Sequence, residues 1–211
     1  MDLIAAPVAA MLDGLVPERP LIMRNMERRA RDDGFPIIGP AAGHFCYLVA
    51  RMMGARSVFE MGSGFGYSTA WFAKAVTENG GGTVDHVVWD EQLSADARSY
   101  MAGLGYADVV RYTMGEAVQA LRDAEGPFDL VFNDIDKTAY PASLDVIRQK
   151  LRPGGVLITD NVLWSGRVFD EGDDSEQTEA IREFTRLVTT STDWSTSIVP
   201  IRDGLVVAIR N

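Results

Sequence analysis

The sequence is short of cysteine and of positive charge. Cys46 is the one cysteine in 211 residues, so the chain can form no internal disulfide and no cysteine-based zinc site. A reducing compartment suits such a chain, and we expect a cytoplasmic protein. Lys and Arg number 20 against 30 Asp and Glu, which gives a net charge of −10. A surface of that sign repels phosphate backbones, so we expect no nucleic-acid partner.

Long apolar runs are missing as well. No stretch reaches the ~18 apolar residues that span a bilayer, so we expect no transmembrane segment and no membrane partner. The first residues lack a basic region ahead of an apolar run, and we therefore expect no signal peptide. The length of 211 residues and a hydrophobic content of 46% suit one domain that can bury a sizeable core.

What is present is a change of periodicity near residue 56. Before it, helical spacing of apolar residues predicts helices over 3–15, 21–31 and 40–53. After it, apolar runs alternate with helical segments. The runs predict strands over 57–61, 84–89, 109–113, 128–132, 155–159, 197–201 and 205–209. The segments between them predict helices over 68–77, 93–104, 117–124, 141–151 and 177–189.

This alternation predicts a doubly wound, Rossmann-like α/β fold whose seven-stranded sheet is mostly parallel, with helices on both faces. Asp203-Gly204 is typical of a hairpin turn, so the last strand should run antiparallel. Ligands of such sheets bind beyond the carboxyl ends of the strands. The functional residues should therefore follow the predicted strands.

A glycine-rich turn follows the first predicted strand. It reads Glu60-Met61-Gly62-Ser63-Gly64-Phe65-Gly66-Tyr67-Ser68. Alternate glycines let a backbone turn tightly and approach a ligand, and the helix that follows offers free amides. The acidic residue and the glycine spacing favour an S-adenosylmethionine (SAM) loop. A dinucleotide loop and a plain tight turn are the alternatives.

Polar residues also end two later strands. Asp134 and Asp136 follow the strand over 128–132, and Asp160-Asn161 follow the strand over 155–159. Carboxylate and amide oxygens are ligands that Mg²⁺, Mn²⁺ and Ca²⁺ prefer. The alternative is that these side chains cap helices and loops.

Taken together, these segments resemble the divalent-metal-dependent O-methyltransferases related to catechol and caffeoyl-coenzyme A O-methyltransferase, especially their small bacterial members. The likeness extends from about residue 34 to the end of the sequence. It is carried by the segments 60–68, 115–117, 128–137, 152–155, 160–166 and 200–205.

The resemblance implies one methyltransferase domain over 1–211, with N-terminal helices over 1–55 as a lid or dimer contact and a SAM-binding core over 56–211. It implies an enzyme that moves a methyl group from SAM to a hydroxyl of a small phenolic or catechol-like molecule, and it implies a homodimer. The first helix carries apolar residues that suit a lid, a dimer contact or packing on the core, namely Leu3, Ile4, Val8, Met11, Leu12 and Leu15.

The resemblance also assigns roles to residues. Asp134, Asp160 and Asn161 match the metal ligands, with Mg²⁺ expected and Mn²⁺ or Ca²⁺ as alternatives. Lys137 matches the general base and acts beside Asp134, although a surface ion pair would also explain it. Trp164 and Ser165 match the acceptor pocket. The positions that match cofactor contacts are Glu60, Gly62, Ser63, Ser68, Ala117 and Asp136.

Two positions depart from the family pattern. Val88 stands where an acid usually binds the ribose of SAM, so either Asp90 substitutes for it or the ribose loses that partner. Asn133 replaces an apolar residue, and it either hydrogen-bonds locally or lines the site. Glu116 could reach the adenine or face solvent. Val88 also keeps open a SAM-binding sensor without catalysis. A dinucleotide-dependent oxidoreductase is a weaker alternative.

Overall fold

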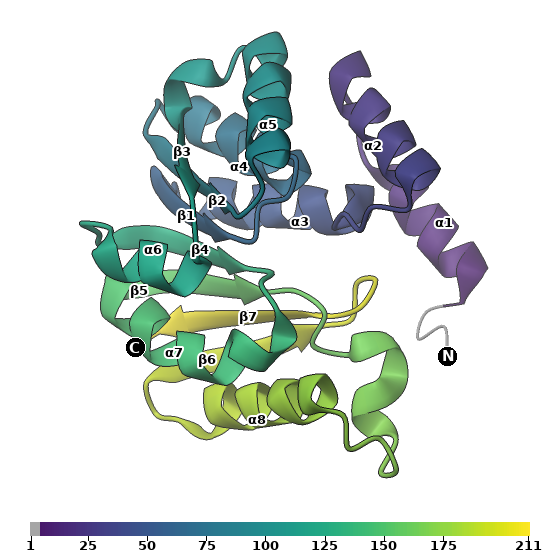
Figure 1. Ribbon diagram of the computed structural model, residues 1–211, viewed down its shortest axis with the longest axis vertical. Helices are drawn as coiled ribbons and strands as arrows, with labels where there is room; N and C mark the ends of the chain where they lie inside the picture. Colours follow the sequence, from purple (N-terminus) through teal and green to yellow (C-terminus); the bar gives the residue numbers. More distant parts are fainter. Residues whose placement is uncertain (1–4) are drawn as a thin grey trace.

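A seven-stranded sheet runs through residues 5–211, the part of the chain that the computed structural model describes (Figure 1). Its strands are β1 (Ser57–Met61), β2 (Thr83–Val88), β3 (Val110–Met114), β4 (Phe128–Asn133), β5 (Leu151–Thr159), β6 (Trp194–Val199) and β7 (Leu205–Arg210). They lie in the order β3-β2-β1-β4-β5-β7-β6. Strands β1 to β5 are parallel, and β7 is antiparallel to β5 and to β6. The predicted doubly wound fold with an antiparallel last strand is confirmed.

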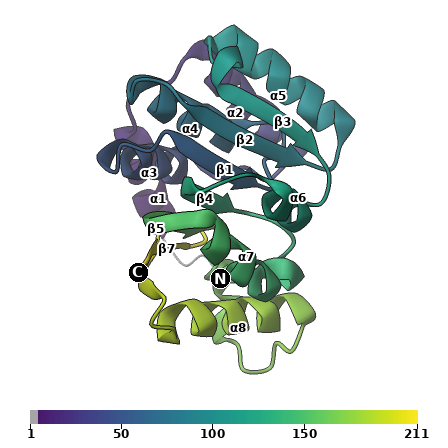
Figure 2. The same cartoon turned by 90° about the vertical axis from the view of Figure 1, so that its left-hand side faces the viewer.

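Helices cover both faces of this sheet (Figure 2). One face carries α3 (Gly39–Met52), α4 (Tyr67–Glu78) and α5 (Glu91–Leu104). The other carries α6 (Ala117–Asp123), α7 (Tyr140–Lys150) and α8 (Glu176–Thr190). Three short 3₁₀ segments, η1 (Ala107–Val109), η2 (Lys137–Ala139) and η3 (Trp164–Phe169), lie in the connections.

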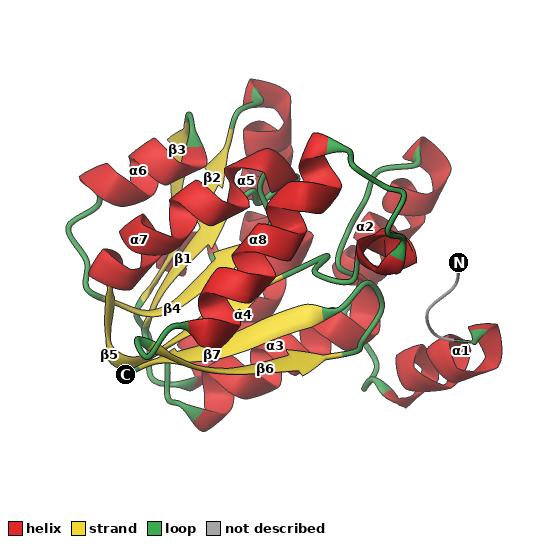
Figure 3. Ribbon diagram, turned by 90° about the horizontal axis from the view of Figure 1, so that it is seen from below, coloured by secondary structure: helices red, strands yellow, loops and turns green. Residues whose placement is uncertain are grey.

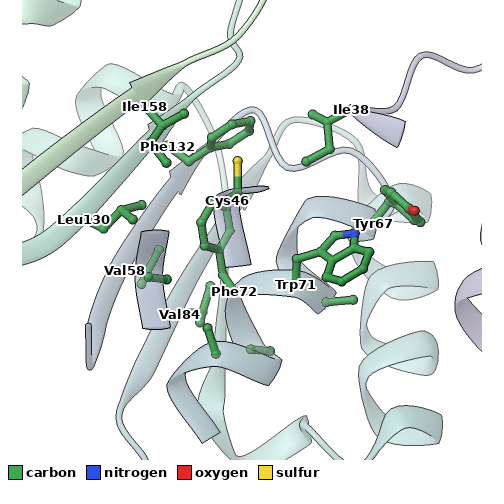
Figure 4. Close-up of a cluster of buried hydrophobic side chains, with 14 of the residues drawn as sticks. Ile38, Cys46, Val58, Tyr67, Trp71, Phe72, Val84, Leu130, Phe132 and Ile158 are labelled. Atoms are coloured by element: carbon green, nitrogen blue, oxygen red, sulfur yellow. The ribbon is translucent and has the colours of Figure 1, made fainter. Parts of the chain in front are cut away.

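The strands are apolar on both sides because each side meets its own hydrophobic cluster. In β4, Leu130 and Phe132 belong to the cluster beneath α3 and α4, and Val131 belongs to the cluster beneath α7 and α8. Figure 4 shows the first cluster, in which Phe72 and Cys46 lie beside the β4 side chains. Burial on both faces explains why the sequence shows unbroken apolar runs at these strands.

Two strands begin earlier than the pattern predicts. β5 starts at Leu151, which pairs with Phe128 ahead of a register shift, so Pro153 and Gly154 lie inside the strand rather than before it. β6 starts at Trp194, whose buried indole belongs to the cluster beneath α8. A bulge accommodates proline and glycine that would otherwise interrupt a ladder.

The N-terminal helices lie to one side of the sheet (Figure 3). α2 (Leu21–Asp33) buries Met23 and Met26, whereas α1 (Ala6–Leu15) buries no residue and leaves Met11 and Leu15 58% and 72% exposed. α1 lies against α3 with Leu12 half-buried, so packing on the core also remains a prediction. A lid and a dimer contact both remain predictions, and Leu3 and Ile4 lie outside the described residues.

No helix within residues 5–211 has the length and apolar character needed to traverse a lipid bilayer.

Candidate active site

A cavity of about 540 Å³ opens at the carboxyl ends of the strands. Parallel strands bring their ends to one edge of the sheet, so short loops from distant parts of the sequence meet there. The wall is built by 35–38, 62–65, 67–68, 87–89, 115, 117, 134–137, 160–161, 164 and 202. Ten of the thirteen predicted site residues line it, and Glu60, Asp90 and Ser165 do not.

The glycine-rich loop forms one side of the cavity. Gly62 has φ of 82°, and a Cβ atom there would lie 2.2 Å from the backbone oxygen of Asp134. Ser63 donates its hydroxyl to the Glu60 carbonyl oxygen at 3.2 Å and accepts the Val87 N–H at 3.0 Å. Gly62, Ser63 and Ser68 all line the cavity, as predicted for cofactor contacts. The loop is thus held against β2 and β4, and α4 begins directly behind it.

Glu60 requires a correction, because its side chain lies behind the loop. It is fully buried and accepts a hydrogen bond from the Thr69 hydroxyl. That hydroxyl is also 3.0 Å from Nδ1 of His86. Burial raises the pKa of Glu60 to about 7 and lowers the pKa of His86 to about 3. Glu60 therefore supports the loop from inside the protein instead of facing the cavity.

The end of β2 also differs from expectation. Val88 and Trp89 line the cavity, whereas Asp90 lies outside it and caps α5, its carboxylate accepting the Leu93 N–H at 2.8 Å. The adjacent backbone amide offered the short aspartate side chain a local partner. Asp90 is therefore engaged as a helix cap here, and its role as a substitute for the missing acid remains a prediction.

The acidic residue at the start of α6 also caps a helix, as Asp90 does at α5. Ala117 lines the cavity as predicted, while Glu116 caps the helix by accepting the N–H groups of Val118 and Gln119 at 2.8 and 2.6 Å. Of the two interpretations of Glu116, the structure shows the helix-start role.

Two carboxylates converge where β4 and β5 end. Asn133 pairs with Thr159 across these strands, so Asp134 and Asp160 follow side by side. Asp160 is 5% exposed, and burial together with the charge of Asp134 raises its pKa to about 7. Burial likewise raises the pKa of Asp134, against the opposing charge of Lys137. Both acids line the same cavity at neighbouring strand ends, so the charge of Asp134 disfavours ionisation of Asp160.

The third predicted ligand lies beside this pair. Asn161 has φ of 61°, donates its backbone N–H to Asp160 at 2.8 Å and its side-chain amide to Asp203 at 3.3 Å. Its amide oxygen is left as an acceptor. Asp136, in contrast, caps η2 by accepting the Thr138 N–H at 2.9 Å, and it also lines the cavity. Capping thus describes Asp136, and Asp160 also accepts a neighbouring backbone N–H, so the metal role of Asp134 and Asp160 remains a prediction.

Within residues 5–211, no three His, Cys, Asp or Glu side chains gather closely enough to hold a metal ion. The predicted set contains two carboxylates and one amide, so its fit to a cation depends on Asn161 and on further ligands from outside the chain.

Lys137 is an ion-paired residue of the cavity wall. Its ammonium lies 2.8 Å from Oδ1 of Asp134 and donates to the Ile135 carbonyl oxygen at 3.1 Å. It also lies 5.0 Å from the ring centre of Tyr140 and 6.0 Å from that of Trp164. With 12% of its side chain exposed, Lys137 is not a solvated surface lysine.

The loop after β5 carries the predicted acceptor contacts. Trp164 lines the cavity, whereas Ser165 is exposed and lies outside it. Both residues have positive φ, and the Ser165 N–H donates to the Asp203 carboxylate. The predicted contact of Ser165 with the acceptor remains a prediction, although the residue is not part of the cavity wall. The acidic loop over 170–176 lies outside the cavity wall, and Arg167 and Arg182 bind its Asp173.

Other predicted polar positions are structural. Asn133 is buried, and its amide nitrogen lies 3.4 Å from the Ser143 hydroxyl, so it hydrogen-bonds locally and does not line the cavity.

The sequence interpretation missed Arg202 and the segment 35–38. Arg202 donates to the Ile37 carbonyl oxygen, and its positive charge partly opposes the rise in the pKa of Asp134 and of Asp160. The segment 35–38 supplies the apolar wall that faces the glycine loop. Arg202 lies in the family-like segment 200–205, which was the available signal, whereas nothing in the sequence marked 35–38.

Comparison with known proteins agrees with this geometry. Residues 18–211 match the sequence profile of a family described as O-methyltransferase. The catechol O-methyltransferase of Niastella koreensis is 29% identical over 187 residues, covering 83% of this chain and 84% of that protein.

Two solved structures share the fold. The Bacillus cereus O-methyltransferase, in complex with S-adenosylhomocysteine (SAH), has a TM-score of 0.87 at 26% identity and covers 97% of both chains. The Streptomyces achromogenes O-methyltransferase TomG, involved in tomaymycin synthesis and solved with SAM, has a TM-score of 0.87 at 25% identity, covering 97% of this chain and 96% of its own. The oxidoreductase alternative is thereby excluded, and this chain belongs to the O-methyltransferase family.

Proposed function

We propose that the protein transfers the methyl group of SAM to a hydroxyl of a small phenolic or catechol-like acceptor, with help from a divalent cation. The observation that carries this proposal is one cavity of about 540 Å³ that contains both the glycine-rich loop and the Asp134–Asp160 pair. The glycine-rich loop is suited to a cofactor that carries a carboxylate, and the Asp134–Asp160 pair is suited to a hard cation.

The cofactor part rests on the loop and on relatives. The start of α4 presents backbone amides behind Gly62 and Ser63, a setting that favours a carboxylate such as that of the methionine part. Ser68, Ala117 and Asp136 complete the wall. The Bacillus cereus and Streptomyces achromogenes proteins were solved with SAH and SAM, which supports the same ligand here.

The cation part rests on the donor set. Asp134 and Asp160 are two carboxylates whose proximity is unfavourable without a positive partner, and Asn161 adds an amide oxygen. Oxygen donors without histidine or thiol favour Mg²⁺ over zinc, with Mn²⁺ and Ca²⁺ as alternatives. Lys137 and Arg202 already balance part of the negative charge of the two carboxylates. Two protein carboxylates, with oxygens from water or from the acceptor, would therefore be enough to bind the cation.

When bound, the cation would lower the pKa of the acceptor hydroxyl and SAM would supply the methyl group. Lys137, at the wall beside Asp134, is placed to take the proton of that hydroxyl. Trp164 offers a ring on which an aromatic acceptor can pack. Because methyl transfer joins two opposite charges, the contribution of the chain is mainly orientation and exclusion of water.

One alternative is a SAM-binding sensor without catalysis, which Val88 favours because the ribose-binding acid is missing. The converging acids and Lys137 argue against it, since a sensor has no need of a cation site. Calorimetry of SAM with and without Mg²⁺ distinguishes the two, because tight binding that ignores the cation supports the sensor.

The first test is transfer of labelled methyl groups from SAM to a panel of catechols, with Mg²⁺ or with a chelator. We expect transfer that requires the cation and that falls by roughly a hundredfold or more in Asp160→Ala. Mg²⁺ should also raise the melting temperature of the wild type and not of this variant.

The matched control is Asp145→Ala, because the Asp145 side chain on α7 is 85% exposed and outside the cavity. It should keep wild-type transfer and the Mg²⁺ effect. Transfer that persists in chelator, with Asp160→Ala fully active, would contradict the cation part of the proposal. A homodimer, expected from the resemblance, remains a prediction that light scattering would test.

A further inference from the structure

The cavity has two chemically different ends. All of its charged lining residues, Asp134, Asp136, Lys137, Asp160 and Arg202, come from the loops after β4, β5 and β6. The wall at the end of β2 and the start of α6 is apolar instead. It consists of Val87, Val88, Trp89, Gly115 and Ala117. A ligand that fills the cavity therefore meets charges at one end and an apolar surface with one indole at the other.

The two carboxylates nearest the apolar end are already engaged. Asp90 accepts the Leu93 N–H at 2.8 Å as the cap of α5. Both carboxylate oxygens of Glu116 accept hydrogen bonds, one from the Val118 N–H and one from the Gln119 N–H of α6. Neither residue lines the cavity. Turning either carboxylate toward a ligand would uncap a helix, so both acids are held by the protein and are not offered to sugar hydroxyls.

Trp89 is the large side chain that this end does present. It lines the cavity, and 73% of its surface is exposed. Among residues 5–211, its indole stacks against no other ring, unlike Trp71, which packs against His44, Tyr47 and Tyr67. An indole face held open at a cavity rim is suited to a planar aromatic group of a ligand.

We propose that Trp89 is the specificity-determining residue of the cofactor site: the adenine ring stacks on its indole and packs on Val88 and Ala117, so the nucleoside is bound through its base and not through the ribose hydroxyls. This inference rests on the proposed function, because it concerns how SAM is held. Stacking on an aromatic side chain depends little on the sugar, whereas a carboxylate binds the hydroxyls directly.

The test measures calorimetric affinities for SAH and for its 2′-deoxy analogue. The wild type should bind both within about threefold, the effect of one ordinary hydrogen bond. Trp89→Ala should bind SAH roughly tenfold more weakly, and Trp89→Phe should keep most of the affinity. The side chain is mostly exposed, so the melting temperature of the free protein should not change in either variant.

The matched control is Asp90→Asn, since asparagine caps a helix as well as aspartate does. It should leave the affinity for SAH unchanged. Val88→Asp should have the opposite effect to Trp89→Ala, because it places an acid at the end of β2. SAH should then bind more tightly, and its 2′-deoxy analogue should bind about tenfold more weakly than SAH.

Two outcomes would overturn the inference. One is a Trp89→Ala variant that binds SAH as the wild type does. The other is a loss of roughly tenfold on removing the 2′-hydroxyl or on changing Asp90 to Asn, which would assign the sugar to that carboxylate. A wild type that does not bind SAH at all would instead refute the proposed function, and this inference with it.

Discussion

At the scale of single residues, acidic side chains divide by what they accept. Asp90, Glu116 and Asp136 accept backbone N–H groups next to them in sequence. Asp134 and Asp160 stand at strand ends and line the cavity, where Asp134 pairs with Lys137 and one oxygen of Asp160 accepts the N–H of Asn161. A carboxylate that caps a helix is satisfied without a ligand, whereas two buried carboxylates at one site gain from a cation.

Glu60 belongs to neither group, because it is ionisable and completely buried. Its folded-state pKa of about 7 lies above the ordinary value of 4.5, so the folded protein binds a proton that the unfolded chain has already lost between those values. The contribution of Glu60 to stability is therefore fully present below pH 4.5 and is lost as the pH rises toward and past 7.

Glu60→Gln should remove this dependence, since glutamine is neutral and can still accept from Thr69. Relative to the wild type, the variant should gain ~3 kcal/mol of unfolding free energy between pH 5 and pH 8. Urea unfolding at the two pH values measures the difference. An unchanged difference would mean that Glu60 ionises normally inside the protein.

At the scale of elements, the glycine loop and the end of β4 are built against each other. The space for a Gly62 side chain is occupied by the Asp134 backbone, 2.2 Å from an ideal Cβ. Neither backbone can yield without displacing a strand end. The loop that we propose for the cofactor and the acid that we propose for the cation are thus packed directly against each other.

Gly62→Ala should therefore disturb both at once. We expect a loss of roughly 2–5 kcal/mol of unfolding free energy from positive φ and overpacking, together with loss of SAH binding. Gly80→Ala is the control, because Gly80 has φ of 94° and nothing within 4 Å of its Cβ position. It should cost only roughly 1–2 kcal/mol. Equal effects of the two substitutions in urea unfolding would show that the close approach is unimportant.

The elements themselves were largely predictable, because each buried strand is a short apolar run. The predicted start of β5 was wrong, because Pro153 and Gly154 indicated a turn, whereas a bulge accommodates them inside the strand. Site residues were predictable as positions along the chain and less so as directions of side chains. Glu60, Asp90 and Ser165 lie at the expected positions of the chain but do not line the cavity. Glu60 is hydrogen-bonded to Thr69, Asp90 accepts the Leu93 N–H, and the backbone of Ser165 donates to Asp203. Local hydrogen-bond partners decide such cases, and a motif does not reveal them.

At the scale of the whole molecule, a ligand that binds only the folded chain stabilises all of it. SAH at a hundred times its Kd should add ~2.7 kcal/mol to the unfolding free energy. For a chain of this size, the melting temperature should then rise by roughly 5–10 °C. NAD at the same concentration should leave it unchanged. Thermal unfolding followed by circular dichroism measures both, and a shift with NAD but none with SAH would contradict the assignment of the cavity.

Arg202 and the segment 35–38 could not be predicted, because their meeting is a property of the complete fold. The guanidinium donates to the Ile37 carbonyl oxygen across 165 positions of sequence. Periodicity and spacing report on neighbours along the chain, and no pattern in either segment points to the other.

The same bond has a consequence for biosynthesis. A ribosome makes residue 37 long before residue 202, because 165 positions of sequence separate them. During translation the glycine loop and the acid pair can take shape while one wall of the pocket is still unmade. A nascent chain that has not yet reached Arg202 lacks that wall of the pocket, so a ligand can assist folding only once this segment has been made.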